Sequence, residues 1–397
     1  MCIIAFWHCE MKAETISLKQ AIDSALSHNY EIKNHTLLAE YRATMKDAGY
    51  TIEQAVLAFD YGQINSVYTD SKISLSQRYQ FPTVYAKQQS LLNEEWNAAV
   101  LNKDVTIAHI KKAVADIYFY LLILKEKEQM LVYADSIYAE FIQKARYRYQ
   151  KGETNILETS TQEAERGTIR LQLQDIRTAL NYHTMQFQLL LNTDKNYEPV
   201  KSALQERMKS QGLTDITLHP ALKHSRQSIQ TAMANKELEQ SKLLPDIQIG
   251  LSNHSIQGVG ADNMDYPVSR RFNSITLGIG IPHPFGAQSA IIDAAETNVR
   301  ISEYEYQYQV QKHQRELQSA IARGDTMLGT IEFMEQTQLP NVSVIQEAAN
   351  KQYAAGEINY LEWTIAINQS MTIRNNYIQA LQSYFEIANT ITYLQEQ

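Results

Sequence analysis

The sequence contains ten histidines and eleven methionines. Both types of side chain can bind metal ions, so a metal site is the first chemistry to consider. His28 and His35 are seven residues apart, and His219 and His224 are five apart. Neither pair has a carboxylate at a useful spacing, and a zinc site needs three or four converging ligands. We therefore expect these histidines to lie on the solvated surface, and we predict no metal site and no cofactor.

No pattern typical of catalysis stands out in the sequence either. It shows no Ser-His-Asp order, no glycine-rich phosphate loop and no carboxylate dyad. Met327 and Met334 are seven residues apart, and we expect them to pack in a helical seam. The formal charge is −8, with acidic and basic residues mixed and no basic stripe, so nucleic acid is not an expected partner. We predict that the protein is not an enzyme.

The first thirteen residues differ from the rest of the chain. Both cysteines, Cys2 and Cys9, lie there, in an apolar run that ends at a polar boundary near Met11. This pattern favours the remnant of a secretory signal peptide over 1–13, and a disordered terminus or tag is the alternative. The longest apolar run elsewhere, Ile117 to Leu124, has eight residues, which is too short for a transmembrane helix.

Two stretches of this sequence, 204 residues apart, repeat each other. Residues 145–158 read ARYRYQKGETNILE, and residues 349–362 read ANKQYAAGEINYLE. A second echo relates residues 81–88 to residues 281–288. The pattern predicts one design present twice, with a first structural repeat over 14–200 and a second over 201–397.

Each repeat is expected to contain a long helical hairpin. From Thr83 to Lys151 there is neither glycine nor proline, and apolar residues recur at three- and four-residue spacing. Gly152 ends this helix, and Thr154 or Asn155 can cap a second one that runs to about Leu191. In the second repeat the helix before Gly356 is interrupted by Pro340, so we expect a kink near 336–339.

Short segments with period two precede each long helix. Residues 73–81 and 275–281 alternate apolar and polar side chains, and their partners are expected at 56–68 and 246–257. The two β-hairpins, about 56–81 and 246–281, would have one apolar and one polar face. Four strands cannot close a barrel alone, so the pattern favours lipid outside, water inside and closure by several chains. Pro82 and Pro282 stand where strand passes to helix.

The chain resembles the TolC family of outer-membrane efflux channels from Ile16 to Leu394. The two Gly-Glu turns, Tyr149–Glu158 and Tyr353–Glu362, carry the resemblance most strongly. Residues 61–65 and 81–85 are most similar to the heavy-metal efflux branch. The resemblance implies a mostly α fold with a small β part. It also implies a homotrimer in which four strands per chain form a twelve-stranded barrel, continued by an α-helical barrel.

The resemblance further implies a passive outer-membrane channel that extends into the periplasm. Its partners would be outer-membrane lipid, a periplasmic adaptor and an inner-membrane pump of the resistance-nodulation-division type. Its cargo would be metal cations. Adaptor docking would use the turn residues Tyr149, Gly152, Glu153, Leu157, Tyr353, Gly356, Glu357 and Leu361. Glu158 and Glu362 would constrict the entrance as a ring of six carboxylates in the trimer.

Other interpretations of the same residues stay open. Each glutamate could instead be a solvated helix N-terminal residue, favoured by the helix dipole. The whole chain could be a soluble or periplasmic coiled-coil interaction protein whose alternating segments are edge hairpins packed on helices. It could also be part of a larger pump fusion.

Overall fold

The computed structural model describes residues 14–207, 215–283 and 286–397, so the signal-peptide prediction for 1–13 lies outside the described residues. In chain order the elements are β1 (Glu14–Ile16), α1 (Leu18–His28), α2 (Tyr30–Met45), the 3-10 helix η1 (Lys46–Tyr50), β2 (Val56–Gly62), β3 (Asp70–Tyr79), α3 (Pro82–Gln150), α4 (Ile156–Leu191), β4 (Tyr197–Pro199), the 3-10 helices η2 (Lys201–Gln205) and η3 (Ile216–Leu218), α5 (Pro220–Ser241), β5 (Asp246–Ser255), β6 (Gly258–Val259), β7 (Asp265–Tyr266), β8 (Arg271–Gly280), α6 (Ala287–Phe333), the π-helix η4 (Met334–Gln338), α7 (Leu339–Ala355) and α8 (Tyr360–Leu394).

The chain forms two compact units, and each draws on both predicted repeats. In its described parts the first unit comprises 14–34, Asp104–Pro220 and Val310–Gln397, and the second comprises His35–Lys103 and Ala221–Gln309. The predicted boundary between 200 and 201 therefore does not separate the compact units. Each unit combines equivalent segments from the two halves of the sequence.

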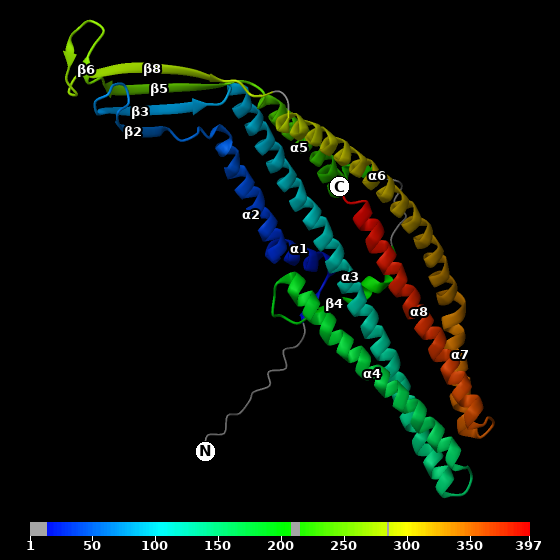
Figure 1. Cartoon of the computed structure of the whole chain (residues 1–397). Coiled ribbons are helices and arrows are strands. Elements are labelled where there is room, and N and C mark those ends of the chain that lie inside the picture. Colours follow the sequence, from blue (N-terminus) through cyan, green and yellow to red (C-terminus); the bar gives the residue numbers. More distant parts are fainter. Residues whose placement is uncertain (1–13, 208–214, 284–285) are drawn as a thin grey trace, which may run out of the picture. The chain divides into compact units, whose positions relative to one another are not determined.

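The second unit contains a four-stranded antiparallel sheet in the order β2-β3-β5-β8 (Figure 1). The hairpins β2–β3 and β5–β8 form as predicted, and β3 pairs with β5 to join them. In the shared register Leu75 lies beside Leu251, and Leu251 lies beside Ile275. A small hairpin, β6–β7, is inserted between β5 and β8.

One face of this sheet is apolar and exposed across all four strands. Leu57 on β2 is 72% exposed and Leu277 on β8 is 75% exposed. The other exposed apolar and aromatic members of this face include Phe59, Tyr61, Ile73, Leu75, Tyr79, Ile247, Ile249, Leu251, Ile275 and Ile279. The opposite face carries small polar side chains, among them Ser252 and Ser274, whose hydroxyls are 2.7 Å apart. The predicted alternation therefore holds over most of the sheet. Its exceptions include Gln77, which lies beside Ile249 on the apolar face, and Val56, which lies beside Ser76 on the polar face.

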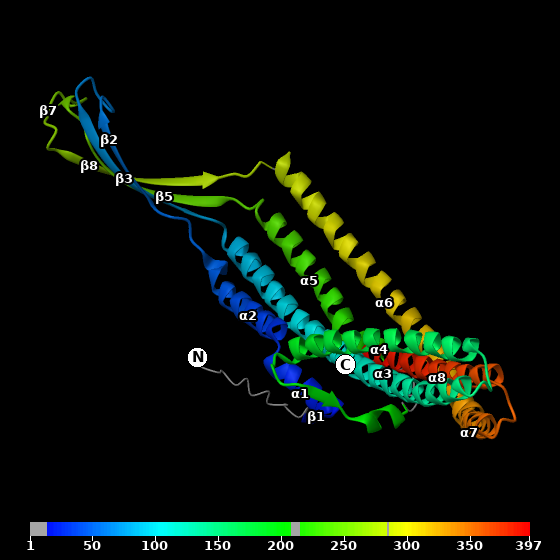
Figure 2. The ribbon, with the colours of Figure 1, turned by 90° about the horizontal axis from the view of Figure 1, so that it is seen from below.

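The core of the first unit is built from long helices. Figure 2 shows α4 folded back along α3 and α8 folded back along α7. The rings of Phe119 on α3 and Phe385 on α8 stack with centroids 4.1 Å apart. The buried Tyr118 hydroxyl donates to the Ile16 carbonyl at 3.1 Å and accepts from the Val200 N–H at 3.0 Å. It thus ties the parallel pair β1–β4 to α3.

The helix before Gly356 is interrupted where the sequence predicts a kink, but by a π-helix. Met334–Gln338 separates α6 from α7, and the Leu339 N–H donates to the Met334 carbonyl five residues back. Pro340 follows directly, and because it has no N–H it cannot continue the regular ladder. The wider π turn absorbs this break within a continuous helical path.

Two histidines that bear on the metal question are buried. The prediction that His219 lies on the solvated surface is wrong, since it is 1% exposed. Its Nε2 lies 3.0 Å from the Tyr393 carbonyl, and Nε2 of His313 lies 2.8 Å from the Leu394 carbonyl. Both rings lie against carbonyl groups in the last turn of α8, where intrahelical donors run out. The Tyr393 carbonyl also accepts from the Glu396 N–H at 3.1 Å. Among the described residues there is no group of three or more side chains that could hold a metal ion.

None of the helices that the structure describes has a stretch long and apolar enough to cross a membrane.

Candidate functional site at the helical turns

The two Gly-Glu turns have the same backbone geometry. Gly152 and Gly356 have φ angles of 77° and 76°, in the left-handed region that glycine tolerates best. Beyond each glycine, the next N–H bonds a carbonyl five residues back: Glu153 to Arg148 at 2.9 Å, and Glu357 to Gln352 at 2.9 Å. The echoed sequence therefore produces two equivalent helix ends, and both glycines are required by the turn.

An asparagine begins the helix after each turn. Asn155 Oδ1 accepts from the N–H of Leu157 at 3.1 Å and of Glu158 at 3.3 Å. Asn359 Oδ1 accepts from the Glu362 N–H at 3.0 Å. These side chains satisfy backbone donors that the first helical turn leaves open.

The predicted docking residues are mostly at the surface of the turns. Tyr149, Leu157 and Leu361 are exposed, and so are Glu153 and Glu357. The structure thus places these five side chains at the surface around the two turns.

Tyr353 is the exception, because it is buried at 3% exposure although its echo Tyr149 is exposed. It belongs to an aromatic cluster with Phe141 and Trp363, whose rings stack with centroids 4.1 Å apart. The Trp363 indole N–H donates to Asn350 Oδ1 at 3.0 Å. The two copies of the echo are therefore not equivalent in their packing.

The buried Tyr353 hydroxyl donates a hydrogen bond to the carboxylate of Glu158. Glu158 is 2% exposed and also accepts from the Thr154 hydroxyl, and Arg148 Nη1 lies 3.8 Å from its Oε1. Burial, followed by the neighbouring Glu158 carboxylate, raises the pKa of Tyr353 to about 12. The phenol therefore stays protonated at neutral pH and remains a donor.

Glu362 has a different environment from Glu158. It is exposed, and its Oε2 accepts from the Asn359 N–H at 2.9 Å in a reciprocal capping box. This is the solvated helix N-terminal role that the sequence left open. The partners of Glu158 (Tyr353, Arg148 and Thr154) were not identified from the sequence, because nothing in the repeat indicates which copy is buried.

The two prolines lie at the predicted strand–helix connections. Pro82 is the first residue of α3, where its missing N–H costs nothing. Pro282 lies after β8 ends at Gly280 and before α6 begins at Ala287.

Comparison with known proteins gives the class to which this architecture corresponds. The family model described as "Outer membrane efflux protein" matches residues 216–394. A search of curated proteins found no match. The second half of the chain thus carries the sequence pattern of outer-membrane efflux proteins.

Solved channel structures share the fold of the whole chain. CusC, reported as forming a transmembrane channel, has 16% identity and a TM-score of 0.78, over 97% of this chain and 94% of its own. VceC of Vibrio cholerae has 15% identity and a TM-score of 0.74, over 96% of each chain. The MtrE channel of Neisseria gonorrhoeae has 15% identity and a TM-score of 0.75, over 95% of this chain and 88% of its own. The fold is therefore that of the outer-membrane channels, as the TolC-family resemblance implied.

Proposed function

We propose that the protein is a passive, non-enzymatic outer-membrane channel that works as the exit duct of a tripartite efflux system. The observation that carries this proposal is the mostly apolar face of the four-stranded sheet, which is exposed on every strand from β2, with Leu57, to β8, with Leu277. Exposure of so many apolar side chains to water would be unfavourable, whereas their contact with lipid would be favourable. The small polar residues of the opposite face suit a water-filled interior.

The edges of the sheet suit closure by several copies, and the TolC-family resemblance implies three of them. β2 and β8 lie at the ends of the strand order, so each leaves one row of backbone groups available for pairing. In a lipid environment such groups must be satisfied, and pairing β2 of one copy with β8 of the next would satisfy them. Three copies would then supply twelve strands to one barrel.

The helical turns would form the periplasmic entrance. Their exposed residues, such as Leu157 and Leu361, are the surface that we propose for docking of the periplasmic adaptor or the inner-membrane pump. A passive duct supplies no energy for transport. The energy would therefore come from the inner-membrane pump, of the resistance-nodulation-division type.

The entrance carboxylates would act on cations. Three copies of the exposed Glu362 would concentrate cations and repel anions at the opening. Glu158 would join the ring only after its contact with Tyr353 breaks, because it is buried beneath that tyrosine. Heavy-metal cations are the cargo we propose, from the resemblance of residues 61–65 and 81–85 to the metal branch.

Fractionation and conductance together test this proposal. We expect the protein in the outer membrane, as a trimer whose migration on a gel changes when the sample is heated, and with single-channel conductance in a planar bilayer. Recovery as a soluble monomer without conductance would contradict the proposal and favour the coiled-coil interaction protein.

A further inference from the structure

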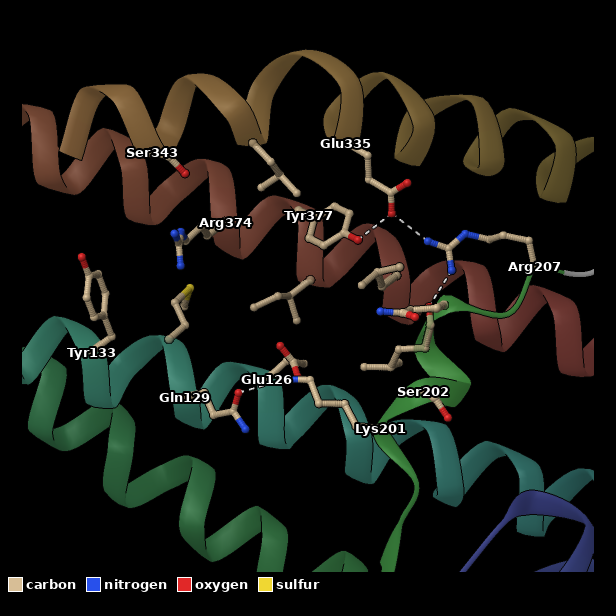
Figure 3. Close-up of a pocket in the computed structure, with 16 residues that line it drawn as sticks. Glu126, Gln129, Tyr133, Lys201, Ser202, Arg207, Glu335, Ser343, Arg374 and Tyr377 are labelled. Carbon is tan, nitrogen blue, oxygen red and sulfur yellow. Dashed lines mark hydrogen bonds and ion pairs between the residues drawn. The ribbon is translucent and has the colours of Figure 1, made fainter. Parts of the chain in front are cut away.

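A groove of about 990 Å³ lies beside the π-helix in the first unit (Figure 3). Its walls come from α3, from the segment around η2, from the π-helix with the start of α7, and from α8. The side chains that line it include Met130, Tyr133, Leu339, Arg374, Ile378 and Leu381. This volume is in the range of small-molecule sites in proteins.

Most of the charges in this groove are paired. Lys201 Nζ lies 2.5 Å from Glu126 Oε1, and Arg207 Nη2 lies 2.8 Å from Glu335 Oε1. The Tyr377 hydroxyl also donates to Glu335 at 2.7 Å. Both acidic residues that line the groove are therefore paired, and they pair with two of its three basic residues.

Arg374 is the third base and has no acidic partner among the residues that the structure describes. Its Nη2 lies 3.5 Å from Gln346 Oε1, and its guanidinium carbon lies 5.8 Å from the ring centre of Tyr133. In Figure 3 it extends from α8 between Ser343 and Tyr133. A guanidinium has five N–H donors, so most of its hydrogen-bonding capacity is available to a ligand.

Apolar side chains surround this charge. Met130, Leu339, Ile378 and Leu381 contribute apolar surface, and the ring of Tyr133 adds an aromatic one. A ligand that fills the groove would therefore need an apolar body in addition to an acidic group.

We propose that this groove binds an amphipathic organic anion, whose carboxylate pairs with Arg374 and whose apolar body packs on Met130, Leu339 and Ile378. The planar guanidinium suits a carboxylate because two parallel hydrogen bonds can form. The site is independent of the proposed channel function, since it depends only on side chains within one copy of the first unit.

Calorimetric titration of the full chain in amphipol with 4-phenylbutyrate tests this inference. We expect saturable binding of one anion per chain, and no comparable binding of the neutral 4-phenylbutanamide. Arg374→Gln should weaken the affinity by about tenfold or more, because a charge-assisted pair is lost. Arg374→Lys should bind with intermediate affinity.

Arg170→Gln is the matched control, because Arg170 is exposed on α4 and pairs with Asp135 outside the groove. It should bind 4-phenylbutyrate as the wild type does. The proposal is wrong if no binding is detected, or if amide and carboxylate bind equally. It is also wrong if Arg374→Gln leaves binding unchanged and instead weakens the oligomer, because Arg374 would then be an intersubunit contact. Circular dichroism of each variant excludes loss of the fold.

Discussion

The Tyr353 hydroxyl donates a hydrogen bond to the carboxylate of Glu158, which lies 195 positions away in the sequence and in the other repeat. It joins the last turn of α7 to the first turn of α4, next to both Gly-Glu turns. Both side chains are buried. If the contact opened, each would lose a hydrogen bond that water could not replace there. The contact therefore holds the two helical turns of one chain together.

Replacing Tyr353 with phenylalanine should loosen the turns. Glu158 would lose one donor while staying buried, at a cost of about 1–3 kcal/mol. We expect a lower unfolding temperature and, in the proposed channel, a higher resting conductance in planar bilayers. Tyr149→Phe is the control, since the echoed tyrosine is exposed and should change neither quantity. Equal effects of the two variants would contradict this role of Tyr353.

The two entrance glutamates should differ in how they affect ion selectivity. Glu362→Gln removes an exposed charge, so the reversal potential in a salt gradient should shift toward lower cation selectivity. Glu158→Gln should mainly raise the resting conductance, because it weakens the contact with Tyr353. The double variant should combine both effects, and unchanged selectivity there would refute the acidic ring.

Two glycine substitutions in the same helical hairpin should change the free energy of unfolding in opposite directions. Gly152→Ala places a Cβ on a left-handed residue and should destabilise the protein by about 1 kcal/mol. Gly167→Ala lies within α4 with open space around it, and should stabilise by about 0.5–1 kcal/mol. Thermal unfolding followed by circular dichroism measures both, and a stabilising Gly152→Ala would rule out the turn geometry.

The two faces of β8 should respond differently to a charge. Leu277→Lys puts an ammonium on the apolar face, which we assign to lipid, at a cost of about 2–4 kcal/mol near the bilayer midplane. Thr276→Lys puts the same charge on the polar face and should be tolerated. Recovery of heat-sensitive trimer from the outer membrane reports the difference. If both variants assemble equally well, the face assignment fails.

Asp135 should make the α3–α4 contact sensitive to acid. It accepts from Arg166 Nε at 2.8 Å and Arg170 Nε at 3.1 Å, and the Arg166 hydrogen bond lowers its pKa below the ordinary 3.8. Its stabilisation is therefore present above that ordinary pKa and is lost as pH falls through the lowered value. Asp135→Asn should be less stable than wild type at pH 7, and the difference should shrink as pH falls below 3.8. A constant difference in melting temperature from pH 7 to 2 would argue against this ion pair.

Local signals made much of this architecture predictable from the sequence. The absence of glycine and proline over 83–151 indicates α3, and period-two alternation indicates β3 and β8. Gly152 and Gly356 mark the helix ends because few other residues adopt a left-handed conformation. Each of these features depends on neighbours along the chain, which is why it can be read without a structure.

Long-range packing decided the rest. Tyr149 and Tyr353 occupy equivalent positions in the echo, yet only Tyr353 is buried, because only that copy packs into the cluster with Trp363. The burial of His219 and the position of Arg374 in the groove likewise depend on helices far apart in the sequence. The sequence by itself determined the repeats, the hairpins and the turns, because local backbone preferences encode them. Tertiary structure alone decided which member of each repeated pair is buried, because burial depends on the elements that happen to surround it.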